Sequence, residues 1–202
     1  MPKDAAPLRI PGAVRILGLD PGTRLVGWGV IEVDGARSRC LGHGVLRANV
    51  RDPVHTRLAA IAGALREVIA AHAPVEAAIE DAFYGRDARA AQRLGEGRGA
   101  LLLVLAEAGL PVSHYANNVV KKAVTGAGRA TKEHVHAMLS RILALGEAPD
   151  TYDASDALAI ALCHHQRRGL PGTEAGLPPR LAQALRKAGV NPKVVRPRKR
   201  RG

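Results

Sequence analysis

The chain has 202 residues, of which 47% are hydrophobic, and it carries a formal net charge of +12. This length and composition allow one domain with a sizeable core. The sequence contains no run of 18 apolar residues that would span a membrane, and its first residues lack the apolar stretch of a secretory signal. Cys40 and Cys163 are isolated, which argues against a disulfide framework or a zinc site. We therefore expect a cytoplasmic protein.

Three strands are expected first, arranged as hairpins, at Val14–Asp20, Val26–Val33 and Arg39–Arg47. The turn pair Pro-Gly stops the first of them. In the second strand, Gly27 and Gly29 alternate with larger residues and leave one face nearly bare. A bare face favours close approach by another backbone or by a ligand.

Helices and strands alternate after residue 54. The apolar spacing predicts helices at residues 55–73, 86–108, 117–124 and 131–145, strands at 75–80 and 111–115, and a last helix that begins near Asp153. Within the second of these helices, Gly95, Gly97 and Gly99 are expected to allow close approach by another helix or by DNA. Residues 157–163 are apolar on all sides, so the last helix should be buried. Together these elements predict an α/β fold, with a mixed sheet flanked by helices.

The positive charge lies mostly at one end of the chain. Residues 167–202 contain 11 Lys and Arg and one acid, whereas residues 1–166 contain 19 Lys and Arg and 17 acids, so the two parts carry +10 and +2. Such a tail attracts phosphate backbones without reading their sequence, although a tail that only aids solubility is a common alternative. We predict a flexible leader at 1–13, a folded domain at 14–166 and a basic, disordered tail at 167–202.

Four acids, Asp20, Glu80, Asp153 and Asp156, stand at the ends of apolar segments that read as buried elements. A fold that gathers them would concentrate a charge of about −4, which is costly at low dielectric unless divalent cations neutralise it. Oxygen ligands of this kind suit Mg²⁺ or Mn²⁺, and two such ions about 3.5–4 Å apart can activate water and stabilise the leaving oxygen in phosphodiester hydrolysis. The working hypothesis is a two-metal phosphodiesterase.

Each acid also has a purely structural explanation. Asp20 precedes Pro-Gly, where Asp often hydrogen-bonds its own turn. Glu80 has Arg86 and Arg89 nearby as salt-bridge partners. The two acids of the last helix would stabilise its start as N-cap and N3 residues. Only the set of four argues for metal chemistry.

The segments LGLDPGTRLVGWGV, AIEDAFYGRDARAAQRLGEGRG, YANNVVKKAVTGAGRATKEHV and YDASDALAIALCHH together resemble the RuvC family of Holliday-junction resolvases. The resemblance covers about Val14–Gln166. It implies a ribonuclease H-like fold of five strands, the first three antiparallel and the others parallel to the first. It also implies a homodimer that nicks two opposed strands of a four-way DNA junction symmetrically and leaves 5′-phosphate and 3′-hydroxyl ends. The RuvA–RuvB branch-migration complex is a further candidate partner.

On this resemblance the catalytic, metal-binding carboxylates are Asp20, Glu80, Asp153 and Asp156, which would hold two Mg²⁺ or Mn²⁺ ions. Asp20 would bridge the ions, Glu80 would help to orient the water, and the two acids of the last helix would complete the second ion.

The resemblance also implies contacts with DNA. Phe83 would be a stacking wedge at the junction centre, and a stacked base contributes about 1–3 kcal/mol. The other candidate DNA-binding residues are Tyr84, Arg86, Lys121, Lys122, Arg129 and Lys132. Of these, Lys121 and Lys132 would lie near the scissile phosphate. The alternatives are ordinary packing for the aromatic residues and solvated surface charge for the basic ones.

Three other functions compete with this hypothesis. An actin-like ATPase or sugar kinase would need a second Asp-Gly phosphate loop and two domains, and the sequence contains neither. A non-catalytic branched-DNA-binding protein would typically have lost one of the acids. A YqgF-type nuclease that acts on RNA fits less well with Phe83 and the DASDALA motif.

Overall fold

The computed structural model describes residues 12–22, 25–81, 87–145 and 149–168. A five-stranded sheet with the order β3-β2-β1-β4-β5 forms its centre. The strands are β1 (Val14–Pro21), β2 (Leu25–Asp34), β3 (Arg37–Arg47), β4 (Glu76–Glu80) and β5 (Val112–Tyr115). The first three are antiparallel, β4 runs parallel to β1, and β5 runs parallel to β4. The predicted mixed sheet is therefore confirmed.

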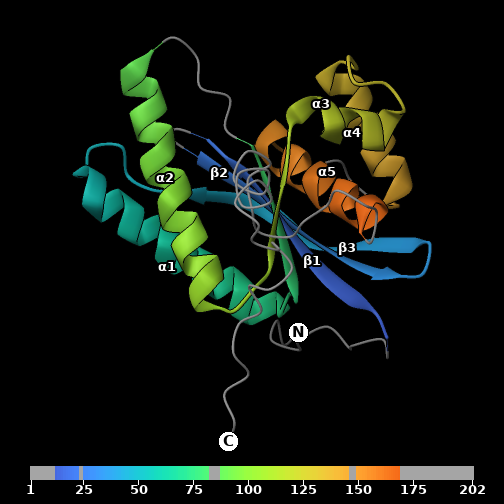
Figure 1. Ribbon diagram of the computed structural model, residues 1–202, viewed down its shortest axis with the longest axis horizontal. Helices are drawn as coiled ribbons and strands as arrows, with labels where there is room; N and C mark the ends of the chain where they lie inside the picture. The colour runs from blue at the N-terminus through green and yellow to red at the C-terminus, as the bar shows by residue number, and fades with distance from the viewer. Residues whose placement is uncertain (1–11, 23–24, 82–86, 146–148, 169–202) are drawn as a thin grey trace, which may run out of the picture.

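Helices cover both faces of the sheet (Figure 1). They are α1 (Val54–His72), α2 (Ala88–Glu107), α3 (Asn117–Thr125), α4 (Lys132–Ile142) and α5 (Tyr152–Arg167). Helices α1 and α2 lie on one face, and α5 lies on the other with α3 and α4 beyond it. All the predicted elements are present, with small differences at their ends. The largest is in α4, which ends at Ile142, before Ala144 with its positive φ of 48°.

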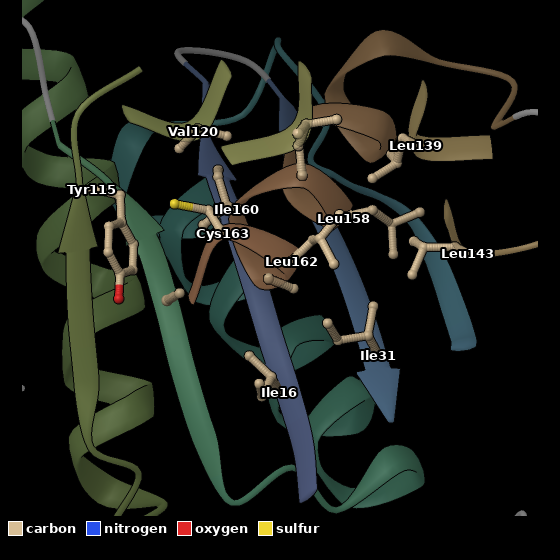
Figure 2. Packing of buried hydrophobic residues seen from close by; sticks show 14 of the residues in the cluster. Ile16, Ile31, Tyr115, Val120, Leu139, Leu143, Leu158, Ile160, Leu162 and Cys163 are labelled. Carbon is tan, nitrogen blue, oxygen red and sulfur yellow. The ribbon is translucent and has the colours of Figure 1, made fainter. Parts of the chain in front are cut away.

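Two hydrophobic clusters hold these layers together. One joins the sheet to α3, α4 and α5 and contains Ile16, Ile31 and Leu158 (Figure 2). The other joins the opposite face to α1 and α2 and contains Leu17, Leu65 and Leu105. Successive residues of β1 enter different clusters because side chains alternate across a strand. This explains the nearly continuous apolar run in β1, which is buried on both faces.

Helix α5 is the most deeply buried helix of the described structure. Residues 157–163 are buried without interruption, as the sequence predicted. Its C-terminal end is tied to β4 by polar contacts: His164 Nε2 lies 2.8 Å from Glu76 Oε2, and the Arg168 guanidinium bonds the same carboxylate at 2.6 and 2.8 Å. On its other side, His164 Nδ1 lies 2.8 Å from the Tyr115 hydroxyl. This network satisfies a histidine that is only 6% exposed.

Three glycines allow α5 to approach the sheet. A Cβ on Gly18 would overlap the Ala157 carbonyl oxygen and lie 2.8 Å from the Ala161 nitrogen, and one on Gly29 would lie 2.7 Å from the Leu158 side chain. A Cβ on Gly27 would overlap the Asp153 carbonyl oxygen. The bare face of β2 therefore receives a helix backbone, which is one of the two expected occupants.

The predicted leader lies outside the described residues except for its last two, as does the predicted tail from residue 169 onwards. Within the described part of the chain, every helix is too short or too polar to cross a membrane.

We predict that Gly18→Ala destabilises the protein by about 3 kcal/mol or more, because the added methyl group would overlap helix backbone that cannot rotate away. Gly63→Ala is the matched control, since a Cβ there meets nothing within 4 Å and alanine favours a helix. Urea unfolding of both variants measures the difference. A loss below about 1 kcal/mol for Gly18→Ala would contradict the close contact.

Candidate active site

Two of the four acids stand on neighbouring parallel strands. Asp20 lies near the end of β1, and Glu80 is the last residue of β4. The register pairs Leu19 with Ile79, so each acid follows one member of that pair. The carboxyl ends of parallel strands meet at one edge of a sheet, which is a frequent location for ligand sites in α/β folds.

The first turn of α5 brings the other two acids to the same edge. Gly27 pairs with Asp20 across β1 and β2, and its missing side chain makes room for the Asp153 backbone. Asp156 follows one turn later on the same helix. The structural explanation of these two acids as N-cap and N3 residues is wrong: the N-cap is Thr151, whose hydroxyl accepts a hydrogen bond from the Ala154 amide at 3.3 Å. Asp153 still lies in the first turn, where the helix dipole favours a negative charge.

The charges of the acids act on one another. Burial and the nearby carboxylates of Glu80, Asp156 and Asp153 raise the pKa of Asp20 from 3.8 to about 8, and a hydrogen bond with Glu80 contributes. Burial also raises the pKa of Asp156, although Lys132 opposes this shift. Asp20 on β1 thus lies close to the acids of β4 and α5, and the four form one acidic group. Shifts of this kind, in which desolvation acts together with specific charged neighbours, are frequent at functional sites.

Among the predicted DNA-binding residues that the structure describes, Lys132 is the one that forms an ion pair with these acids. It is the first residue of α4, and its ammonium lies 3.4 Å from Asp156 Oδ2. The charge of Asp156 is the main reason why the pKa of Lys132 is raised. The ammonium also lies 5.7 Å from the centre of the Tyr152 ring, within range of a cation–π interaction. Within the described residues, Lys132 therefore places a positive charge against the acidic group.

The donor set suits a divalent metal in chemical character, because carboxylate oxygens are hard ligands and their mutual repulsion favours a shared cation. Their present arrangement is looser than a coordination sphere. Among the described residues, no group of three or more His, Cys, Asp or Glu side chains is placed so that it could hold a metal ion. The charges of the four carboxylates act on one another, but the carboxylates are not arranged around a common point where an ion would sit.

Sequence reasoning missed two residues at this edge. Asn117, the first residue of α3, donates a hydrogen bond from Nδ2 to Glu80 Oε1 at 2.8 Å. Tyr152 precedes Asp153, is 49% exposed and packs edge-on against His136. The position of Asn117 two residues beyond the end of a strand was the available signal for the first. The alternative explanation of Glu80, a salt bridge to Arg89, is not found among the described residues, and its other candidate partner, Arg86, lies outside them.

The remaining predicted DNA-binding residues divide into two groups. Lys121 and Lys122 lie on α3, and Arg129 lies in the connection to α4; within the described residues, none of them forms an ion pair with the four acids. Phe83, Tyr84 and Arg86 lie outside the described residues.

The glycines of α2 have free space around them. A Cβ on Gly95, Gly97 or Gly99 would meet nothing within 4 Å in the described structure. The expected close approach by another helix is therefore not made within the described part of this chain. The alternative, an approach by DNA, stays a prediction.

Comparison with known proteins assigns a family to this arrangement. The family model described as crossover junction endodeoxyribonuclease RuvC matches residues 16–164. A crossover junction endodeoxyribonuclease RuvC from Rhodospirillum rubrum is 48% identical over 157 residues, which cover 77% of this chain and 92% of that protein. The match extends from β1 into α5 and so includes all four acids.

Solved structures agree with the sequence comparison. A Thermus thermophilus RuvC structure has a TM-score of 0.70 at 36% identity and covers 76% of this chain and 95% of its own. A second structure, of T. thermophilus RuvC in complex with a Holliday junction substrate, has the same TM-score at 35% identity and covers 76% and 94%. The predicted ribonuclease H-like α/β fold is confirmed at this level.

The shifted pKa of Asp20 predicts how stability depends on pH in EDTA. The folded protein retains a proton on Asp20 up to about pH 8, whereas the unfolded chain loses it near pH 4. Ionisation in the folded state is therefore costly, and stability falls as pH rises from about 4 to 8. We expect Asp20→Asn to raise the melting temperature by about 5 °C at pH 8, and by much less at pH 4.

Asp34→Asn is the control for this prediction, because Asp34 ends β2 in an exposed position. Thermal unfolding followed by circular dichroism measures both variants at both pH values. Equal effects of Asp20→Asn at pH 4 and pH 8 would contradict the coupling of the acids.

Proposed function

Because the chain belongs to the RuvC family of crossover junction endodeoxyribonucleases, we propose that it resolves four-way DNA junctions by cutting one phosphodiester bond in each of two opposed strands. The observation that carries the proposal is the meeting of Asp20, Glu80, Asp153 and Asp156 at one edge of the sheet within the matched region. Two cuts at symmetric positions would leave 5′-phosphate and 3′-hydroxyl ends that a ligase can join.

The four carboxylates would hold two Mg²⁺ or Mn²⁺ ions. When bound, such ions supply Lewis acidity and a water of lowered pKa. Asp20 is suited to bridge them, because its strand β1 lies beside β4 and under α5, and the charges of the other three acids all act on its carboxyl group. Glu80, fixed by Asn117 through Oε1, would help to orient the attacking water. The ammonium of Lys132 would stabilise negative charge on the phosphate oxygens, as a compact cation does at such a site.

A second copy of the chain would complete the reaction. One acidic group cuts one strand, so paired incisions in opposed strands call for two groups related by symmetry. A homodimer provides them, since twofold symmetry is the commonest form of protein assembly. The glycines of α2, with free space around them, are available for such a partner or for DNA.

Other parts of the chain would act on DNA without taking part in the chemistry. Phe83 would stack on unpaired bases at the junction centre, with Tyr84 beside it, and Arg86, Lys121, Lys122 and Arg129 would hold the backbone. The basic tail would add affinity that is independent of sequence.

We also propose the cytoplasm as the compartment and RuvA–RuvB as a partner. A non-catalytic role is disfavoured by the full set of acids, and a YqgF-type activity on RNA by the family match.

We predict that Asp20→Asn and Glu80→Gln each reduce junction cleavage by at least 10³-fold, because each removes a charged ligand that the reaction requires. EDTA should abolish cleavage by the unaltered protein. Junction affinity, measured by gel shift in EDTA, should change less than threefold. Glu67→Gln, at an exposed position of α1, is the control and should cut at the normal rate. A proportional loss of binding and cleavage would contradict a catalytic role and indicate a folding role.

We also predict that Phe83→Ala slows junction cleavage about tenfold while affinity for linear duplex stays unchanged, because a stacking wedge acts only on unpaired bases. Phe83→Trp, which retains a stacking ring, should preserve most of the rate. Cleavage of a synthetic junction beside a linear duplex of the same sequence measures both effects. An unchanged rate for Phe83→Ala would remove the wedge from the proposal.

A further inference from the structure

Arg98 on α2 lies against the part of β4 that carries Glu80. Its side chain is only 11% exposed, and its Nη1 donates a hydrogen bond to the main-chain carbonyl of Glu80. Its Nη2 lies 2.5 Å from His114 Nδ1 on β5 and 3.7 Å from Asp81 Oδ1. One guanidinium therefore joins α2 to the adjacent ends of β4 and β5.

The chemistry of these groups fixes the state of His114. A guanidinium only donates hydrogen bonds, so Nδ1 of His114 must be the acceptor and the ring proton lies on Nε2. Burial and the charge of Arg98 both lower the pKa of His114, although Asp81 opposes them. A neutral imidazole and a carboxylate thus hold the guanidinium, and its orientation follows from the planar fork of donors that arginine presents.

Glu80 is consequently held at two points. Arg98 holds its main-chain carbonyl from the α2 side, and Asn117 holds its carboxylate from α3. Because Glu80 is the last residue of β4, these contacts and the bond from the Asp81 amide to the Tyr115 carbonyl at 2.8 Å fix the backbone where the strand ends. Small displacements there would move the carboxylate relative to Asp20.

We propose that Arg98 is a positioning residue for Glu80. By holding the end of β4, it keeps the Glu80 carboxylate beside Asp20, in the position that a metal ligand requires. The proposal rests on the proposed function. It assigns to this arginine an effect on metal affinity and on the rate of cleavage, with no part in DNA affinity. A direct phosphate contact is disfavoured because the side chain is largely buried and its donors face Glu80, His114 and Asp81.

The test uses Arg98→Lys, which keeps the charge but cannot bridge the Glu80 carbonyl and His114 together. We expect the dissociation constant for Mn²⁺, measured by calorimetry without DNA, to weaken about 10–100-fold, since loss of a contact that orients a ligand has effects of this size. Single-turnover cleavage should slow by a similar factor, and junction affinity in EDTA should stay within threefold. Arg66→Lys is the matched control, because it alters an exposed arginine that pairs with Glu107 at 2.8 Å.

His114→Leu is the second variant. It removes the acceptor that orients the guanidinium while Arg98 stays in place, and it should weaken Mn²⁺ binding about 3–10-fold. If Arg98→Lys fails to give a cooperative thermal transition, this variant decides the question. Unchanged Mn²⁺ affinity in a folded variant, or a loss of junction affinity that accounts for the slower cleavage, would overturn the positioning role.

The two proposals fail separately. If the unaltered protein binds Mn²⁺ but leaves junctions intact, the proposed function falls, and a weaker affinity in Arg98→Lys still supports the positioning role. If the unaltered protein cuts junctions but Arg98→Lys binds Mn²⁺ normally, only the positioning role falls. If the unaltered protein binds no Mn²⁺, both fall.

Discussion

Direct contact between the backbone of α5 and the backbones of β1 and β2 determines where the four acids meet. Gly18, Gly27 and Gly29 make this contact possible, because any side chain at the first two would overlap helix backbone. The contact at Gly27 is the decisive one, since Gly27 pairs with Asp20 on one side and touches Asp153 on the other. A wider gap, with side chains between helix and sheet, would separate the acids of α5 from those of the strands.

The same contact creates an electrostatic cost that the protein carries for its function. Burial and neighbouring acids raise the pKa of Asp20 to about 8, and Lys132 balances only part of the charge. The free energy that stabilises the fold must therefore come from other contacts. The two hydrophobic clusters on either side of β1 are the evident source. Stability is therefore given up at this edge of the sheet, as is frequent at functional sites.

Much of the fold was predictable because periodicity reports burial directly. The run of apolar residues in β1 and the fully apolar stretch of α5 both indicated elements covered on all sides, and the four acids stood out at their ends. Contacts between distant residues were less accessible. The hydroxyl of Thr151 caps α5 in place of the two acids, and the contacts of Asn117 and Arg98 with Glu80 depend on how α2 and α3 pack. Such packing has no local signature in one sequence.

The tie between Glu76, His164 and Arg168 lies at the opposite end of α5 from its acids. From Asp153 to His164 the helix extends roughly 16 Å, and β4 begins at Glu76 and ends at Glu80. Helix α5 and strand β4 are thus joined at the end that lies away from the acids. A side chain of different length at this tie would tilt the helix relative to the strand and alter the distance between the α5 acids and Glu80. Substitutions at this tie would therefore change the spacing of the acids, and with it the cation preference proposed for them, while the acids themselves stay the same.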